Sequence, residues 1–219
     1  MSLLKTAAKK IKIVLIALFS MALFLAPVPA SLHILYMLEE KERSASPPKN
    51  TALSAEQVVA NARSLVGRPY DQFMGGKDNL GKKLGGIVCI DVVNTAYKRA
   101  GICFERELRS VFRKTPEYFS YRSWNNPWDR NFARRVRNFR AYCRAKDLVF
   151  YDEKKLKPGD VVIFGTGHIA LVDTVSENGF TVIEAAGKKY IALRAHRDEL
   201  YERNIERYGK PIFARILKE

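Results

Sequence analysis

Short apolar segments separated by turn residues, in the C-terminal part of the chain, constrain the fold most strongly. Each segment has the length of a strand, and Pro-Gly-Asp and Glu-Asn-Gly turns accompany them. Because connections of a few residues join neighbouring antiparallel strands, the pattern predicts an antiparallel meander. The five expected strands cover residues 161–164, 168–172, 180–187, 190–193 and 212–217.

Two helices are expected ahead of this sheet. Ser54 can cap a helix whose apolar residues repeat with helical spacing until Gly67 ends it. The second helix is expected to begin at Cys89, after a glycine-rich loop, and to end at Gly101. The predicted class is therefore α+β, with a helix packed on an antiparallel sheet of about five strands.

The N-terminus is expected to be a targeting segment. Four lysines precede a run of 26 uncharged residues, Ile13 to Leu38, which is long enough to span a bilayer. Ala30 also ends a shorter apolar stretch in the manner of a signal cleavage site. We therefore expect residues 1–38 to be either a signal peptide or a membrane anchor. The flanking lysines argue against a buried core helix.

Either form would place the rest of the chain outside the cytoplasm, in the periplasm or the extracellular space. In the anchored form, residues 13–38 would hold the protein in the inner membrane. Residues 39–53, which are charged and include two adjacent prolines, are expected to be an exposed linker. Residues 54–219 would then form the folded domain.

Charge and composition narrow the possible partners. The chain has 38 Lys and Arg against 23 Asp and Glu, and it keeps a net charge of +11 without its four N-terminal lysines. Such a domain favours an anionic partner, which is either nucleic acid, a membrane surface or an acidic envelope polymer, and export makes nucleic acid the weaker choice. An apolar content of 47% excludes a disordered chain. Three Cys and three His argue against a disulfide framework and a structural zinc site.

Cys89 is the candidate nucleophile. A thiol reacts as the thiolate, and the partial positive charge of a helix N-terminus lowers the pKa of a nearby thiol. A cysteine in the first turn of a helix has this setting, whereas Cys103 and Cys143 lie on apolar faces and are expected in the core. Alternatively, Cys89 is a buried structural cysteine.

A thiolate nucleophile needs a base, and His168 is the candidate. It begins an expected strand, and Glu184 lies in the following one, so both side chains can share one face of the sheet. Glu184 would then orient the imidazole and stabilise its charge. Alternatively, the histidine is a surface residue and the glutamate belongs to an exposed strand face. His33 lies in the targeting segment, and His196 lies in a basic stretch expected at the surface.

The pattern around these residues resembles the NlpC-type cysteine peptidases of the papain-like superfamily, which are similar to the CHAP amidases. Gly-Arg-Pro-Tyr precedes the cysteine, and Pro-Gly-Asp and Gly-His-Ile-Ala-Leu-Val follow it. The resemblance covers Ser54 to about Ala186. It implies a papain-like fold and the cleavage of peptide or amide bonds in peptidoglycan. The expected reaction needs no metal or organic cofactor.

For single residues, the resemblance implies Cys89 as nucleophile, His168 as general base and Glu184 as the third polar residue. Tyr70 corresponds to the family's aromatic residue, a hydroxyl donor near the oxyanion. We also expect Asp91 beside the substrate or the oxyanion.

This sequence departs from the family at its nucleophile. The family usually reads Asp-Cys-Ser-Gly, whereas residues 88–91 read Val-Cys-Ile-Asp, and the family's third residue is often His, Asn or Gln. The Cys-x-Asp-Val-Val motif is similar to that of an uncharacterised exported branch of the superfamily. That branch also carries an Asp-Arg-Asn segment like residues 129–131.

Residues 104–155 form a basic, aromatic insertion between the two parts of the candidate site. Residues 104–151 contain 12 of the chain's 24 aromatic residues. Residues 129–143 fit an amphipathic helix with Phe132, Val136, Phe139 and Cys143 on its apolar face. The arginines on its other faces either are solvated or hold an anionic polymer or membrane headgroups. The loop of residues 124–128, with two tryptophans, can line a cleft.

The leading hypothesis is an exported thiol hydrolase acting on peptidoglycan. One alternative keeps the same site for another acyl substrate, including the case of a toxin aimed at the cell wall of a rival. Another is a non-catalytic envelope-binding module that uses the basic, aromatic insertion. A nucleic-acid binder, which would show a steep salt dependence, comes last.

Overall fold

A computed structural model describes residues 53–73, 85–120 and 125–217. All of them belong to one compact unit, Ser46–Glu219. The expected targeting segment and nearly all of the expected linker lie outside the described residues. Within the described ranges, no helix combines the length and the apolar character needed to cross a membrane.

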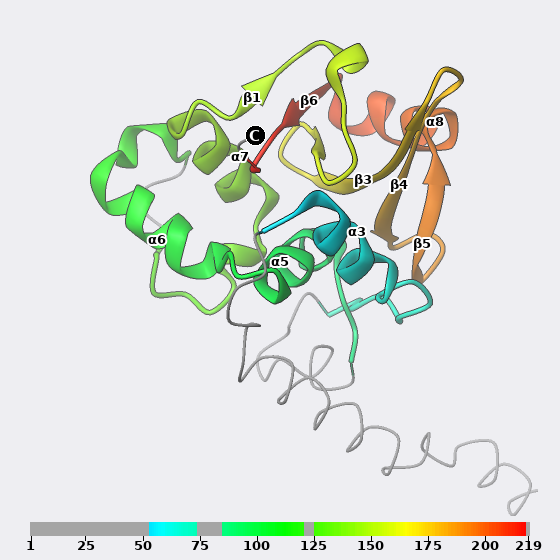
Figure 1. Ribbon diagram of the computed structural model, residues 1–219. Coiled ribbons are helices and arrows are strands. Elements are labelled where there is room, and N and C mark those ends of the chain that lie inside the picture. Colours follow the sequence, from blue (N-terminus) through cyan, green and yellow to red (C-terminus); the bar gives the residue numbers. More distant parts are fainter. Residues whose placement is uncertain (1–52, 74–84, 121–124, 218–219) are drawn as a thin grey trace, which may run out of the picture. The chain divides into compact units, whose positions relative to one another are not determined.

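A six-stranded antiparallel sheet forms the centre of this unit (Figure 1). Its spatial order is β1-β6-β2-β3-β4-β5. In chain order the strands are β1 (Val149–Phe150), β2 (Val161–Phe164), β3 (His168–Ser176), β4 (Gly179–Ala186), β5 (Ile191–His196) and β6 (Pro211–Ala214).

The α+β class is confirmed, and the strand order refines the predicted meander. β2 to β5 follow one another as expected, but β6 returns across the sheet and pairs with both β1 and β2. The two-residue strand β1 brings the number of strands among the described residues to six. The last strand also ends earlier than predicted, at Ala214.

One face of the sheet is covered by α3 (Ala55–Arg63) and α5 (Cys89–Arg99). As predicted, Ser54 caps α3 by accepting a hydrogen bond from the backbone N–H of Gln57 at 3.2 Å. The apolar side of α5 packs on β3 and β4, and the Tyr97 hydroxyl on this helix donates to the carbonyl oxygen of Gly159 at 2.8 Å. The predicted packing of this helix on the sheet is therefore confirmed.

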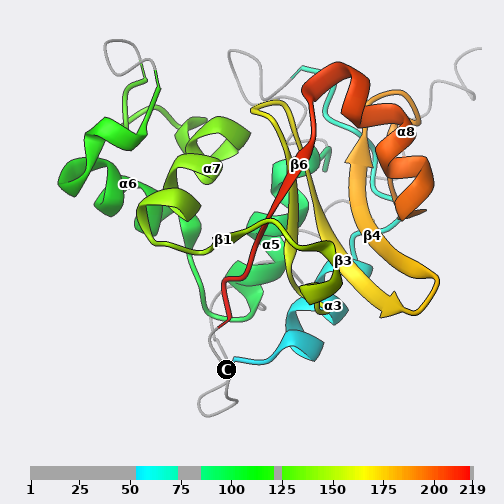
Figure 2. The ribbon, with the colours of Figure 1, turned by 90° about the horizontal axis from the view of Figure 1, so that it is seen from above.

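The opposite face is covered by α8 (Arg197–Tyr208), a helix that the sequence pattern did not predict (Figures 1 and 2). Alternate residues of β3 serve the two faces. Ile169 and Leu171 pack on the α5 side, whereas Ala170 and Val172 pack on the α8 side. Because both faces are buried, these strands are apolar almost without interruption.

The insertion contains α6 (Phe104–Lys114) and α7 (Val136–Ala145), which lie to one side of the sheet, away from β4 and β5 (Figures 1 and 2). Among the described residues of this part of the chain there are also three 3₁₀ turns: η1 (Pro116–Tyr118), η2 (Phe132–Arg134) and, before β2, η3 (Glu153–Lys155). The helix predicted for residues 129–143 begins later than expected because η2 occupies its first turn. Its predicted apolar face is buried, but Arg134, expected among the solvated arginines, is buried as well.

Candidate active site

Cys89 is the first residue of α5, and 7% of it is exposed. The helix start is stabilised from within, because the Asp91 carboxylate accepts a hydrogen bond from the backbone N–H of Val88 at 3.0 Å. The partial positive charge of the helix N-terminus therefore lies at the Cys89 thiol.

His168 begins β3 and meets Glu184 of the neighbouring strand β4. The register pairs Leu171 with Ile183, so His168 and Glu184 lie on the same sheet face as diagonal neighbours. The His168 Nε2 atom is 2.5 Å from Oε2 of Glu184, whose side chain is completely buried. The strand pattern had predicted this juxtaposition.

The Cys89 side chain is hydrogen-bonded to His168. Since Nε2 of the imidazole bonds Glu184, Nδ1 is the ring nitrogen left for the thiol. The structure therefore joins Cys89, His168 and Glu184, from α5, β3 and β4, in one connected chain of side chains. A nucleophile bonded to a base, which is bonded in turn to an orienting group, is the arrangement needed for covalent catalysis.

Interactions among these side chains shift the pKa values of His168 and Glu184. Burial lowers the pKa of His168, but its hydrogen bonds to Cys89 and Glu184 and their charges outweigh burial and raise the pKa to about 9. Burial raises the pKa of Glu184, but the bond to His168 and the charges of His168 and Arg203 lower it below its ordinary value. The site therefore favours a charged imidazole beside the charged carboxylate of Glu184.

The raised pKa of His168 predicts a pH dependence of activity. We expect kcat/KM for a soluble peptidoglycan fragment to fall as pH rises through about 9, because the ring then loses the proton it must give to the leaving amine. The contribution of the charged ring to stability should be complete below its ordinary pKa of 6.5 and disappear over the same upper range. An activity profile that already falls near pH 7 would contradict this ionisation.

Arg203 of α8 completes the surroundings of Glu184. Its guanidinium forms an ion pair with Oε1, the carboxylate oxygen that His168 does not use. A buried carboxylate without a cation would tend to take up a proton, and a neutral acid would hold the imidazolium less strongly. Arg203 therefore keeps Glu184 charged. Sequence reasoning missed this residue because it did not predict α8.

Tyr208, at the end of α8, holds the other side of the histidine. Its ring stacks on the His168 ring with centroids 6.2 Å apart and planes inclined by 13°. The turn before β3 leaves space for it, since a Cβ atom at Gly167 would lie 2.4 Å from the Tyr208 ring. Gly165 also approaches Tyr208 too closely for a side chain. The two glycines on either side of Thr166 were therefore the only sequence signal for this contact.

Substitutions of Glu184 test its role as the orienting group. Glu184→Gln should keep part of the activity because its amide oxygen can accept from the imidazole, whereas Glu184→Ala should lose roughly 10²–10⁴-fold in kcat. The matched control is Glu177→Gln, the same change in the exposed turn before β4, which should leave kcat unchanged. Equal activity of Glu184→Ala and Glu177→Gln would exclude an orienting role.

Tyr70 is half-buried, with its ring against Gly187. Burial, followed by the charge of Cys89, raises the pKa of Tyr70 to about 12. The phenol therefore stays protonated at neutral pH and can donate a hydrogen bond near the thiol. Its predicted part in stabilising the oxyanion stays a prediction.

Asp91 points into the protein and not only toward the helix start. Arg134 from η2 forms an ion pair with Asp91 at 2.6 Å and a second one with Asp71 at 2.9 Å. These buried contacts tie the insertion to the beginning of α5 and to the segment that follows Tyr70. They give Asp91 a structural task, and its expected role toward substrate or oxyanion stays a prediction.

The other cysteines have different surroundings. Cys143 is completely buried, and burial raises the pKa of its thiol far above the ordinary value, as expected of a core residue. Cys103 is half-buried at the start of α6. His196 caps α8. Nowhere in the described ranges do three or more His, Cys, Asp or Glu side chains gather as metal ligands would.

A family model described as "Domain of unknown function (DUF1287)" matches residues 77–205, which is more than half of the chain and contains Cys89, His168, Glu184 and Arg203. The chain belongs to the DUF1287 family. No curated protein matches it.

The DUF1287 chain is also similar to solved structures at low identity. The structure of NlpC2 from Trichomonas vaginalis is 13% identical, with a TM-score of 0.43 over 79% of this chain and 50% of that one. The chain thus spans half the length of that protein. The P60 domain of antigen MAP1204 from M. avium subspecies paratuberculosis is 16% identical, with a TM-score of 0.42 over 75% and 96%. The NlpC/p60 domain of peptidoglycan hydrolase SagA is 16% identical, with a TM-score of 0.37 over 74% of this chain and 99% of that one.

Proposed function

We propose that this DUF1287 protein is an exported thiol hydrolase that cleaves peptide or amide bonds in peptidoglycan. One observation carries the proposal. The Cys89 thiol, at a helix N-terminus, is bonded to His168, and the buried carboxylate of Glu184 holds the other ring nitrogen of that histidine. This arrangement supports attack on a carbonyl carbon by a thiolate.

The proposed reaction has two steps, and the geometry of the site supports both. In the first, the Cys89 sulfur bonds to the carbonyl carbon, and the imidazolium of His168 gives its proton to the leaving amine as the C–N bond breaks. In the second, neutral His168 takes a proton from water, the hydroxide attacks the thioester, and the thiolate leaves. The N-terminus of α5 and the Tyr70 hydroxyl supply donors for the oxyanion in both steps.

Two observations favour peptidoglycan as the substrate. The residue pattern around the site resembles that of NlpC-type peptidases, and its Cys-x-Asp-Val-Val motif fits an exported branch of their superfamily. The chain also carries a net charge of +15, which attracts anionic polymers of the cell envelope.

Digestion of peptidoglycan tests the proposal. The purified protein should release soluble fragments whose masses identify the bond that is cleaved. If the protein hydrolyses other acyl substrates but leaves peptidoglycan intact, the assignment of the catalytic site stands and the proposed substrate is wrong. A chain that binds peptidoglycan and hydrolyses nothing would be an envelope-binding module.

Export gives a separate prediction. In a bacterial host, a reporter enzyme that works only outside the cytoplasm should be active when fused after residue 50, because the lysine-flanked apolar run directs the downstream part of the chain across the membrane. The intact mass of the product distinguishes the two forms: a start at Ser31 indicates cleavage, and a start at Met1 or Ser2 indicates an anchor. A soluble cytoplasmic product would contradict both.

A further inference from the structure

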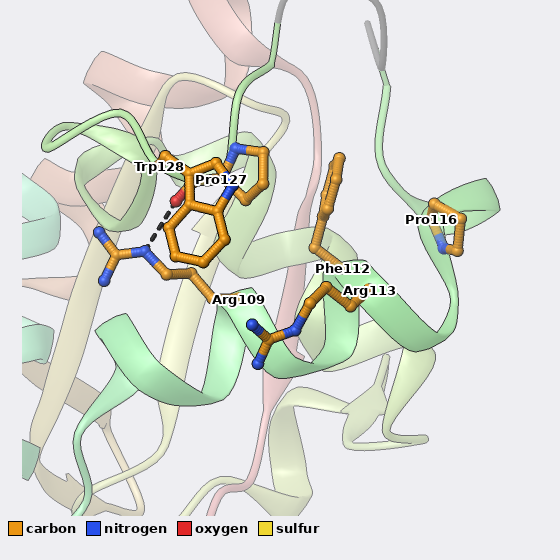
Figure 3. Close-up of a pocket in the computed structure, with 6 residues that line it drawn as sticks. All are labelled: Arg109, Phe112, Arg113, Pro116, Pro127 and Trp128. Carbon is orange, nitrogen blue, oxygen red and sulfur yellow. Dashed lines mark hydrogen bonds between the residues drawn. The ribbon is translucent and has the colours of Figure 1, made fainter.

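A pocket of about 240 Å³ lies within the insertion, between α6, the residue that begins η1 and the segment before η2 (Figure 3). None of the side chains that line it belongs to the candidate active site. They are Arg109, Phe112, Arg113, Pro116, Pro127 and Trp128.

The walls of this pocket are apolar and include an indole that is open to solvent. Trp128 is 72% exposed, so it is not a core residue, whereas Phe112 packs on Phe119 and Phe132. In Figure 3, Trp128 and Arg109 form one side of the pocket, and Phe112 and Arg113 form the other. A flat, apolar ligand face can therefore lie on the indole.

The charged groups of the pocket are hydrogen-bond donors. Arg109 is already engaged, because its Nε donates to the Pro127 carbonyl oxygen at 2.7 Å and its guanidinium pairs with Glu105 at 2.8 Å. Arg113 lies one turn further along the same helix face and is exposed, and no acidic side chain among the described residues pairs with it. The pocket thus combines an open aromatic face with an available guanidinium and favours a ligand that carries an anion.

We propose that this pocket binds a sugar ring that carries a carboxylate, as N-acetylmuramic acid does. The volume is below the roughly 300–1,000 Å³ of pockets for drug-sized ligands, so it suits a single ring. The C–H face of a pyranose can lie on Trp128, and a guanidinium can hold a carboxylate with two parallel hydrogen bonds.

The choice of a muramyl sugar rests on the proposed function, because this sugar belongs to the glycan of peptidoglycan. Its lactyl carboxylate becomes free when the amide bond to the stem peptide is hydrolysed. The pocket would then hold a glycan strand from which an amidase-type reaction has removed a peptide, while the site at Cys89 acts on peptide.

Fluorescence of Trp128 measures this binding directly. The chain contains two tryptophans, so a Trp124→Phe variant of the full chain leaves Trp128 as the only one. Three probes separate the parts of the ligand: N-acetylmuramic acid, N-acetylglucosamine as the ring alone, and D-lactate as the carboxylate alone. N-acetylmuramic acid should change the emission saturably and bind at least about tenfold more tightly than either part.

Two arginine variants on the same helix give a matched comparison. Arg113→Gln should weaken the binding of N-acetylmuramic acid about tenfold, to the level of N-acetylglucosamine. Arg106→Gln removes the same charge from a side chain of α6 that is 76% exposed and lies outside the pocket, and it should leave the affinity unchanged. Equal affinities for the three probes, equal effects of the two variants, or no saturable change would each overturn the proposal.

The same measurement separates this proposal from the proposed function, because it needs no hydrolysis. If the protein binds the sugar but does not digest peptidoglycan, the proposal of a sugar-binding pocket stands and the proposed hydrolase function is wrong. If the protein digests peptidoglycan but does not bind the sugar, only the proposal of a sugar-binding pocket is wrong.

Discussion

Replacing Cys89 with alanine is expected to abolish the hydrolysis of peptidoglycan, with a loss of at least roughly 10⁴-fold in kcat. The thiolate forms the only covalent bond to substrate in the proposed reaction, and no neighbouring group can take its place. The fold should persist, because the change removes one small group at a helix start whose cap comes from Asp91. Circular dichroism and urea denaturation check this, and fragment release measured by mass spectrometry checks the activity.

Cys103→Ala is the matched control, because it removes the same group from a half-buried position at the start of α6. This variant should keep its activity. Iodoacetamide should label Cys89 faster than Cys103 in the folded protein, and the opposite order would show that the reactive thiol has been assigned to the wrong residue.

Arg134→Met is expected to destabilise the protein by about 3–5 kcal/mol, because it leaves two carboxylates without their shared cation. The Asp71 side chain is completely buried and that of Asp91 is 12% exposed, so water compensates little for the loss. Urea denaturation at neutral pH measures the change. Hydrolysis should weaken as well, since the same arginine positions Asp91 at the start of the helix that carries Cys89.

Arg144→Met, at the exposed end of α7, provides the comparison for this stability change. It removes an equal charge from the same insertion, and its effect should stay within about 0.5 kcal/mol. If both variants unfold at the same urea concentration, the buried ion pairs do not stabilise the fold.

Local sequence patterns were sufficient to predict the centre of the candidate site. Gly101 and the apolar spacing that precedes it placed Cys89 at the start of a helix, and the turn before β4 set the register that brings His168 and Glu184 together. These features depend on residues that are close along the chain or joined by one short turn, which is where sequence patterns are most informative.

The elements that sequence analysis missed depend on distant contacts. α8 is mostly charged and buries only Leu200 and Asn204 among its own residues, so its apolar periodicity is weak. Arg134 lies on a segment that looked like the solvated side of a helix, and only the distant carboxylates of Asp71 and Asp91 explain its burial. No pattern within either segment reveals such partners.

The position of α8 between β5 and β6 also affects when the candidate site can form. Arg203 and Tyr208, which contact Glu184 and His168, come from a helix that follows β5 in the chain, and β6 must cross back between β1 and β2 after it. We expect β6 to pair with β1 and β2 late in folding. Closing the long loop between these distant segments costs entropy, which is offset only once the neighbouring strands are in place. A chain truncated before α8 would therefore carry Cys89 without the contacts that Arg203 and Tyr208 make to Glu184 and His168, so the candidate site is complete only when the whole domain has folded.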